Sequence, residues 1–222
     1  MHNRQCILPL KWNIISKPKD IIIAEHNSVA FDTLKQWPGN NQDNFLCIVG
    51  DKSSGKTTLA SMWAKQVCAD FIACDEDLLQ RWYSIENNDN QQRFFVLDDA
   101  DKVRDDVFLF HIYNTIKTKN AYLLLTAETY PTEWNLSLKD TKSRLTTINV
   151  IKIKQPNEQV IDTILIKMLE RRGIEATPQI IKYISDRIER SYSGINRIVN
   201  IIDKNLATLN KKISIQNLKH IL

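Results

Sequence analysis

The segment Gly50–Thr57 has the residue types and the spacing that hold a phosphate group. It follows the pattern G-x-x-x-x-G-K-T and reads Gly50, Asp51, Lys52, Ser53, Ser54, Gly55, Lys56 and Thr57. Its glycines let backbone N–H groups converge on phosphate oxygens, where larger side chains would block the approach. Lys56 can reach the β- and γ-phosphates, and the Thr57 hydroxyl can bind Mg²⁺. We therefore expect this loop, together with Thr58, to bind ADP or ATP at the start of a helix.

Two carboxylates follow the apolar run Phe94–Leu97. Asp98 would hold Mg²⁺ through water, and Asp99 could orient the water that attacks the γ-phosphate. A turn cap is the alternative for an aspartate at the end of a strand, but the preceding phosphate loop favours the metal site. Asp99 is one methylene shorter than the glutamate usual in fast ATPases. Slow turnover is therefore expected, and enzymatic activity of the chain itself stays open.

Three further residues could act on the γ-phosphate. Thr126 and Glu128 stand at the end of another apolar run, where either could sense the nucleotide; we expect Glu128 to be a ligand, and a plain loop carboxylate is the alternative. Arg144 follows a loop and precedes an apolar run. It could be an arginine finger supplied to a neighbour's nucleotide, or an ordinary surface arginine.

The segment Gln5–Leu10 combines one amide with apolar residues on an extended, proline-stiffened stretch. Such a segment can dock into a preformed groove of a partner at low entropic cost. The expected contacts are Gln5, Leu8, Pro9 and Leu10. Packing of this tail on its own domain is the alternative.

Hydrophobic patterning predicts the elements that position these residues. Apolar runs without polar alternation are typical of parallel strands covered on both faces, and their alternation with helices predicts one doubly wound sheet with right-handed crossovers. The expected strands are 45–49, 71–73, 94–97, 122–126 and 149–153. The expected helices between them are 27–37, 55–70, 75–82 and 107–117.

After residues 155–157 the pattern becomes helical, over 158–172, 178–189, 193–209 and 214–222. Pro178 suits a first helical turn, and Gly173 suits the end of the preceding helix. The sequence thus predicts an N-terminal tail over 1–18, an α/β nucleotide-binding domain over 19–154 and a small helical domain over 155–222.

The composition is that of an ordinary globular protein, with 43% apolar and 25% charged residues. The net charge of +4 permits contact with nucleic acid but does not argue for it, so direct DNA binding is expected to be weak or absent. No apolar stretch approaches the ~18 residues of a membrane span, and the start lacks a signal peptide; we expect a cytoplasmic protein.

Several side chains could be mistaken for ligands. The spacing of Cys6, Cys47, Cys68 and Cys74 lacks C-x-x-C and favours buried thiols in a reducing compartment over a zinc site. Trp63, Phe94 and Phe95 stand at core spacing rather than as base-stacking platforms. His26 lies near where this kind of fold holds adenine, but a surface role is expected.

Together these residues resemble the DnaA branch of the AAA+ proteins, and most closely the Hda family of DnaA-related regulators. The similarity covers nearly the whole chain. It is carried by Gln5–Leu10, Asp20–Phe31, the phosphate loop and the segments 96–101, 123–131, 140–145 and 187–191.

The resemblance implies an AAA+ core with a parallel sheet, followed by a helical lid. It implies that Gln5–Leu10 is the Q-x-x-L-P-L motif that binds the DNA polymerase III sliding clamp (β subunit), and that Arg144 is the family's arginine finger. A protein of this kind would hold nucleotide, bind the clamp loaded on DNA and present Arg144 to ATP on DnaA. The initiator would be left in its inactive ADP form, which prevents re-initiation. Self-association is possible.

Two departures from the family pattern affect nucleotide sensing. Ser193 stands where the family has its sensor-2 arginine, with Arg190 and Arg197 as nearby substitutes; we expect Arg190 to contact nucleotide. Glu128 stands where DnaA has aspartate. The chain also ends at Leu222 with the lid, where DnaA would continue into a DNA-binding domain, so the initiator itself is not expected.

Two other functions stay open. The chain could be an AAA+ ATPase that loads a helicase or remodels a complex, which the complete pair of phosphate loop and Asp98-Asp99 would support. It could also be a DNA-binding module, for which the mild positive charge is the support. Whether ADP or ATP is the active form is open as well.

Overall fold

The computed structural model describes residues 22–39, 43–72, 82, 93–209 and 213–219. Its centre is a five-stranded parallel sheet with the strand order β2-β3-β4-β1-β5. The strands are β1 (Phe45–Val49), β2 (Asp70–Ile72), β3 (Phe94–Leu97), β4 (Tyr122–Ala127) and β5 (Asn149–Lys152). All five were predicted from the apolar runs, with bounds that shift by at most one residue.

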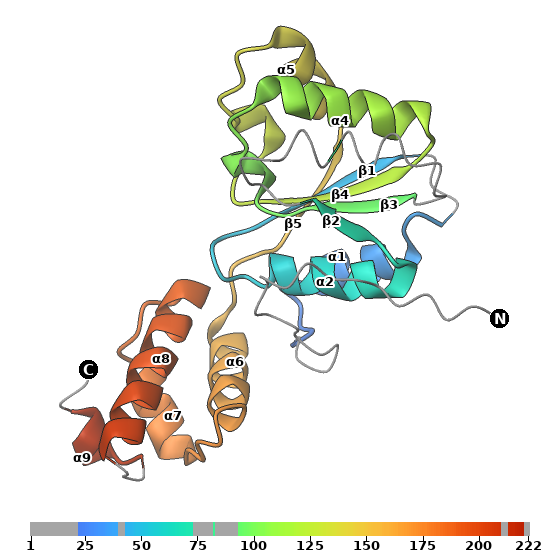
Figure 1. The fold of residues 1–222 in the computed structure, drawn as a ribbon. Helices are drawn as coiled ribbons and strands as arrows, with labels where there is room; N and C mark the ends of the chain where they lie inside the picture. Colours follow the sequence, from blue (N-terminus) through green and yellow to red (C-terminus); the bar gives the residue numbers. More distant parts are fainter. Residues whose placement is uncertain (1–21, 40–42, 73–81, 83–92, 210–212, 220–222) are drawn as a thin grey trace.

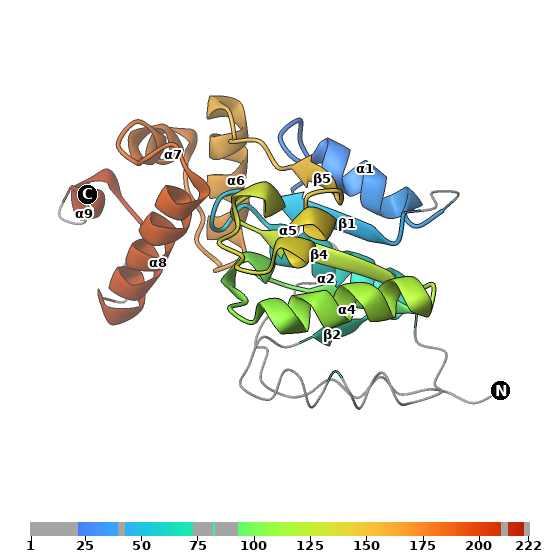
Figure 2. The ribbon, with the colours of Figure 1, turned by 90° about the horizontal axis from the view of Figure 1, so that it is seen from above.

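Helices cover both faces of this sheet, as Figures 1 and 2 show. One face carries α1 (Ser28–Gln36) and α2 (Lys56–Val67), and the other carries α4 (Asp106–Thr118) and α5 (Lys139–Leu145). Burial on both faces explains why the central strands β1 and β3 are apolar at every position.

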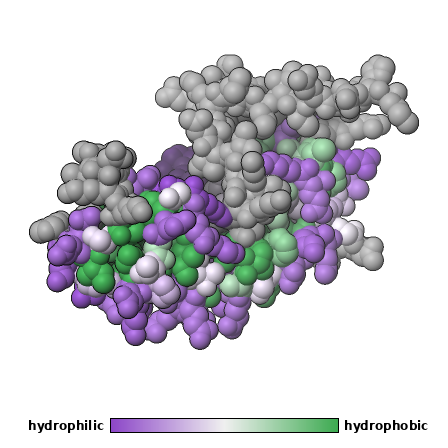
Figure 3. All heavy atoms as spheres, turned by 90° about the horizontal axis from the view of Figure 1, so that it is seen from below, coloured by the Kyte–Doolittle hydropathy of each residue, from purple (hydrophilic) through white to green (hydrophobic). Residues whose placement is uncertain are grey.

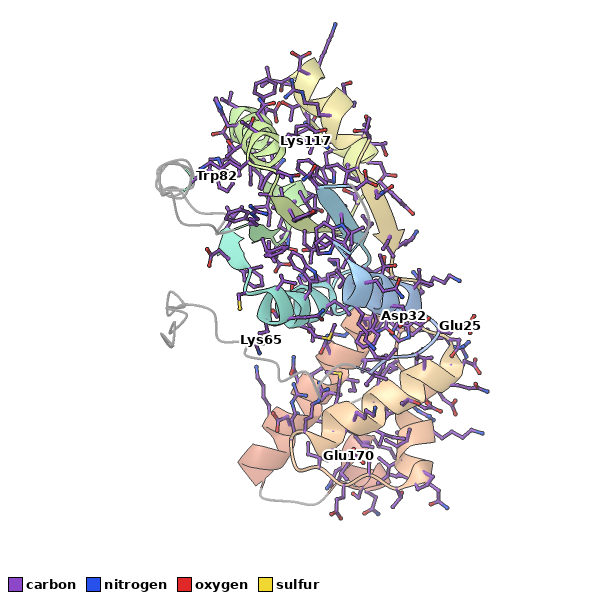
Figure 4. All side chains as sticks on the ribbon, turned by 90° about the vertical axis from the view of Figure 1, so that its right-hand side faces the viewer. Glu25, Asp32, Lys65, Trp82, Lys117 and Glu170 are labelled. Carbon is purple, nitrogen blue, oxygen red and sulfur yellow. The ribbon has the colours of Figure 1, made fainter. Side chains whose placement is uncertain are left out.

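The sheet separates two apolar cores. Along β4, Leu124 packs in the core with Trp63 of α2, whereas Leu123 and Leu125 pack in the core with Phe108 of α4. Successive side chains of a strand point to opposite faces, so one strand contributes to both cores. Trp82 belongs to the α4 side, where its ring lies 5.5 Å from that of Phe95 (Figure 4 labels it).

The register brings the carboxyl ends of three strands together. Val49 at the end of β1 pairs with Ala127 of β4, and Leu97 at the end of β3 pairs with Leu125 of β4. The residues that follow these ends, at the phosphate loop, at Asp98 and at Glu128, therefore meet at one edge of the sheet.

The remaining helices form a separate helical part with its own apolar core, the lid. They are α6 (Glu158–Glu170), α7 (Pro178–Ser185), α8 (Tyr192–Leu209) and α9 (Ile215–Leu218). Side-chain caps from Asn157, Thr177 and Ser214 begin three of them. In Figures 1 and 4 the lid lies below the α1–α2 face, and Glu25 stands close to the junction.

Seen from the lid side, apolar and polar side chains alternate over the surface (Figure 3). The large apolar side chains that the lid exposes in the described part of the chain are Ile166 and Ile215. Across the described ranges, no helix is long and apolar enough to cross a bilayer.

Three sequence expectations need correction. Arg144 was expected between a loop and a strand, but it lies in the helix α5. Cys68 is exposed rather than a buried thiol, while Cys47 is buried as expected. His26 is buried, not on the surface. In addition, β5 is an edge strand whose side chains are half-exposed or exposed.

Other expectations are borne out or lie beyond the described ranges. Trp63, Phe94 and Phe95 pack in the two cores, as expected. The predicted contacts Gln5, Leu8, Pro9 and Leu10, the thiols of Cys6 and Cys74, and the helix 75–82 apart from Trp82 lie outside the described residues.

Candidate nucleotide-binding site

The phosphate loop has a backbone shape that depends on its glycines. Ser53 and Gly55 both have positive φ, of 66° and 93°, which an ordinary side chain rarely adopts. A Cβ on Gly50 would lie 2.8 Å from Ser54 Oγ and 3.0 Å from Ile153 Cβ. A side chain at this first position would therefore force Ser54 and Ile153 to shift, so glycine suits a loop whose backbone approaches phosphate.

Lys56 begins α2 and is buried at the base of this loop. Its Nζ donates hydrogen bonds to the carbonyl oxygens of Gly50, at 2.7 Å, and Asp51, at 2.9 Å. Burial lowers the pKa of Lys56, and the nearby carboxylates, Glu128 and Asp99 first among them, act in the opposite direction. The ammonium is thus held at the loop by its own backbone, where it can pair with phosphate oxygens.

Asp98 lies between two hydroxyls that come from different elements. Thr57 Oγ1 of α2 donates to Asp98 Oδ2 at 2.8 Å, and Thr126 Oγ1 of β4 donates to Oδ1 at 2.5 Å. Asp98 is buried, with 8% of its surface exposed. Thr57 and Asp98 are the pair of oxygen ligands that would hold Mg²⁺ next to nucleotide phosphates, so these residues fit the metal.

Asp99 follows with a left-handed backbone, φ 53°, and begins the short 3₁₀ helix η2 (Ala100–Lys102). Its Oδ2 accepts a hydrogen bond from Lys102 Nζ at 2.6 Å. Lys102 Nζ also lies 3.7 Å from Glu128 Oε1. The Glu128 backbone N–H donates to Asp101 Oδ2 at 3.0 Å, so η2 is fastened to the end of β4.

A second polar site, formed by His26 and Tyr192, lies at the junction with the lid. The rings of His26 and Tyr192 are 5.7 Å apart, and both residues are 6% exposed. His26 Nδ1 and the Tyr192 hydroxyl are buried without a hydrogen-bond partner within the described ranges. Burial lowers the pKa of His26 and raises the pKa of Tyr192, where Asp51 of the phosphate loop adds to the effect. Both groups are therefore neutral near pH 7, each with unused hydrogen-bonding capacity.

The start of α8 approaches the phosphate loop. Ser193 Oγ lies 3.4 Å from the Lys52 carbonyl oxygen, and Gln155 at the start of the lid donates to Asp51 Oδ2 at 3.1 Å. Arg190 instead forms an exposed ion pair with Glu158 of α6. Arg197 stands one turn after Ser193 and shares its side of the helix.

Arg144 lies on the other face of the sheet, in the α4–α5 layer. Its guanidinium stacks over the Phe110 ring at 4.5 Å and over the Tyr113 ring at 5.5 Å. Arg144 Nη1 also donates to Asn114 Oδ1. All three contacts are on α4, away from the loop Gly50–Thr57.

The structure thus brings together the phosphate loop, Asp98, Asp99 and Glu128, and it leaves Arg144 and Arg190 apart from them. Three residues lie at the site although the sequence analysis did not name them. Lys102 could have been identified from its spacing, because it lies three residues after Asp99 and could reach it across one helical turn. Asp101 and Tyr192 carry no local signal, because their partners come from distant segments.

Two curated proteins are similar to this chain in sequence. An uncharacterized protein of Haemophilus influenzae is 24% identical over 99% of both chains. The chromosomal replication initiator protein DnaA of Bacteroides thetaiotaomicron is 24% identical over 86% of this chain, which spans 45% of that DnaA. The chain is therefore DnaA-related and corresponds to less than half of that relative.

Solved structures show the fold. Domain III of the Thermotoga maritima replication initiation protein DnaA superposes with a TM-score of 0.76, at 15% identity, over 92% of this chain and 94% of that domain. AMPPCP-bound DnaA from Aquifex aeolicus superposes with a TM-score of 0.66, at 19% identity, over 86% and 65%. The architecture is the AAA+ P-loop fold with a helical lid.

The model of one protein family, described as novel STAND NTPase 3, matches residues 39–171. This range begins before β1, includes the phosphate loop, Asp98 and Arg144, and extends through α6. It makes up more than half of the 222 residues, and the chain therefore belongs to the novel STAND NTPase 3 family.

Proposed function

We propose that this chain is an Hda-type regulator of chromosome replication: it holds ADP or ATP with Mg²⁺, binds the sliding clamp on DNA and promotes hydrolysis of ATP bound to DnaA. The observation that carries the proposal is the placement of Arg144 on the α4–α5 face, where its guanidinium contacts Phe110, Tyr113 and Asn114 of α4. An arginine held there is suited to act on a nucleotide that another protein presents.

The nucleotide would be held in cis by the loop Gly50–Thr57. Backbone N–H groups and Lys56 would bind its phosphates, and Thr57 and Asp98 would hold Mg²⁺. His26 and Tyr192 supply the two buried polar atoms that a base could satisfy. The AMPPCP bound in Aquifex aeolicus DnaA supports an adenine nucleotide.

Arg144 would act in trans by stabilising the negative charge that develops on the transferred phosphoryl group. Its aromatic support limits the orientations of the guanidinium, which reduces the entropy lost on contact with the partner. Beside it, a surface hollow of about 400 Å³ is lined by Phe110, Leu138, Lys139 and Asp140. The half-exposed Leu138 gives this hollow an apolar side, which suits a protein partner.

Clamp binding would come from the tail 1–18, through Gln5, Leu8, Pro9 and Leu10, ahead of the nucleotide-binding domain 19–154 and the lid 155–222. An amide together with apolar side chains fits a preformed groove. A clamp pull-down should lose the chain when Gln5→Ala and Leu8→Ala are combined. Retention of that double variant would remove the tethering part of the proposal.

The catalytic part is tested with purified DnaA–ATP, with the clamp loaded on DNA. The wild-type chain should accelerate loss of the bound ATP only when the clamp is present, and Arg144→Ala should not accelerate it. If Arg144→Ala accelerated the loss of ATP as much as the wild type, the role of Arg144 as an arginine finger would be rejected.

A second candidate is an ATPase that loads a helicase or remodels a complex. The site favours it in one respect, because Lys56, Thr57, Asp98 and Asp99 stand together as in hydrolysing AAA+ proteins. It requires hydrolysis of the chain's own ATP that rises steeply with its concentration, as Arg144 from one copy reaches the next. Slow turnover that does not depend on concentration would exclude it.

A further inference from the structure

The short helix η2 holds Lys102 directly against Asp99. The Lys102 backbone N–H donates to the Asp99 carbonyl at 2.9 Å, which closes a 3₁₀ turn. In a 3₁₀ helix the side chains at i and i+3 lie one above the other. The Lys102 ammonium consequently reaches Asp99 Oδ2 at 2.6 Å. This pair is set by the backbone and not by a chance meeting of two long side chains.

The turn is fastened to Thr126 of β4 and to Glu128, the residue that follows this strand. The Asp99 backbone N–H donates to Thr126 Oγ1 at 3.0 Å, and Asp101 accepts from the Glu128 backbone N–H at 3.0 Å. The same Thr126 hydroxyl donates to Asp98. Asp99 and Lys102 therefore keep their positions relative to the Mg²⁺-binding carboxylate.

Asp99 is the carboxylate placed to orient an attacking water, and this role needs an open acceptor oxygen. An ammonium bonded to Oδ2 at 2.6 Å competes with water for that oxygen. The hydrogen bond that Lys102 donates to Asp99 raises the pKa of Lys102, so the lysine is charged at neutral pH. Glu128 Oε1, 3.7 Å away, offers the ammonium a second partner to which it could move.

We propose that Lys102 is a positioning residue that restrains Asp99 and keeps hydrolysis of ATP bound to this chain slow. The inference rests on the proposed nucleotide site, but not on the action of Arg144 on another protein. Stabilisation of the fold is a poor alternative role for the pair, because its side chains are 57% and 41% exposed and ion pairs exposed to solvent contribute little to stability.

The test is single-turnover hydrolysis of ATP bound to the full-length chain with Mg²⁺, alongside the affinity for a fluorescent ADP analogue. Lys102→Met keeps the length of the side chain and removes the charge, and it should raise the hydrolysis rate by roughly tenfold or more. Lys102→Arg should stay slow, since it keeps the cation. Lys167→Met, on an exposed lysine of α6, should change nothing.

The double variant Lys102→Met with Asp99→Asn tests whether Lys102 acts on hydrolysis through Asp99. Its rate should fall back to that of the wild type or below, because the carboxylate that Lys102 restrains is gone. ADP affinity should change by less than about twofold in the Lys102 variants, since a restraint on Asp99 acts on the reaction and not on binding.

An unchanged or lower rate in Lys102→Met would overturn the inference, and so would a double variant that stays fast. In both cases ADP binding by the wild type would leave the proposed nucleotide site intact. Absence of ADP binding by the wild type would instead overturn the nucleotide site, and this inference with it.

Discussion

The Thr126 hydroxyl at the end of β4 donates a 2.5 Å hydrogen bond to Asp98, the carboxylate that follows β3. Asp98 receives a second hydrogen bond, from Thr57 at the start of α2. The ends of three elements therefore converge on one buried carboxylate. A movement of Asp98 would alter its hydrogen bonds to both Thr126 of β4 and Thr57 of α2.

Thr126→Val, which keeps the shape of the side chain and removes the hydroxyl, should lower the free energy of unfolding by about 1.5–3 kcal/mol, the usual effect of a hydrogen bond to a charged group. Thr126→Ser keeps the donor and should lose less. Urea titration of both variants measures the difference. Equal stability of Val and Ser variants would show that the hydrogen bond contributes nothing.

The stability of the chain should depend on pH through His26. Burial lowers the pKa of His26, whereas the unfolded chain has the ordinary value of about 6.5. As the pH falls through that value, the unfolded state gains a proton at His26 before the folded state does, so the free energy of unfolding decreases. His26→Gln cannot titrate and should lose less stability on acidification.

This comparison is made by urea titration without nucleotide at pH values on either side of about 6.5. The three other histidines are present in both proteins, so their effects cancel in the difference. Parallel pH curves for the wild type and His26→Gln would contradict the burial of His26 as a neutral side chain.

Thiol labelling should separate the two described cysteines. Burial in β1, with the Asp101 carboxylate nearby, raises the pKa of the Cys47 thiol to about 12, and the thiolate is the reactive form. Cys68 is exposed at the end of α2. At neutral pH, Cys68→Ser should remove one fast-reacting thiol from the folded protein, and Cys47→Ala should remove none. A fast thiol missing from Cys47→Ala would contradict the buried position.

Much of the fold was predictable because its signals are local. The phosphate loop is a contiguous motif, and the strands β1, β3 and β4 are apolar runs bounded by turn residues. The half-exposed β5 was also found, because its apolar residues form a run even though the strand lies at the edge of the sheet.

The helix α5 was not predictable in this way. Its sequence has no apolar periodicity, with Thr141 and Leu145 as its buried residues. The helix is instead fixed from a distance: Asp106 of α4 accepts from the Ser137 and Leu138 backbone N–H groups just before it, and Thr141 Oγ1 donates to the Asp106 carbonyl. A cap supplied by another helix leaves no local pattern.

The site shows the same division. Lys56, Thr57, Asp98 and Asp99 follow from motifs, but the pairing of His26 with Tyr192 joins the segment before α1 to the start of α8. Residues that far apart in sequence become neighbours through the position of the lid, which hydrophobic spacing does not give. The burial of His26 and Tyr192 was therefore found only in the structure and not from the sequence.

If Arg144 acts on ATP held by another protein, changing Arg144 must slow the hydrolysis of that ATP. ATP bound to DnaA is followed in a single turnover, with the clamp loaded on DNA and with the wild-type chain, Arg144→Ala, Arg144→Lys or a chain with Gln5→Ala and Leu8→Ala. An arginine finger supplied in trans contributes about 10³–10⁵ in rate, and lysine lacks its planar fork.

We expect rapid loss of the bound ATP with the wild type and slow loss with both Arg144 variants, while their ADP affinity stays at the wild-type value. The chain with Gln5→Ala and Leu8→Ala should also fail to accelerate the loss of ATP, because it is not held at the clamp. Rapid loss with Arg144→Ala, or no acceleration by the wild type on clamp-loaded DNA, would show that Arg144 is not an arginine finger for DnaA.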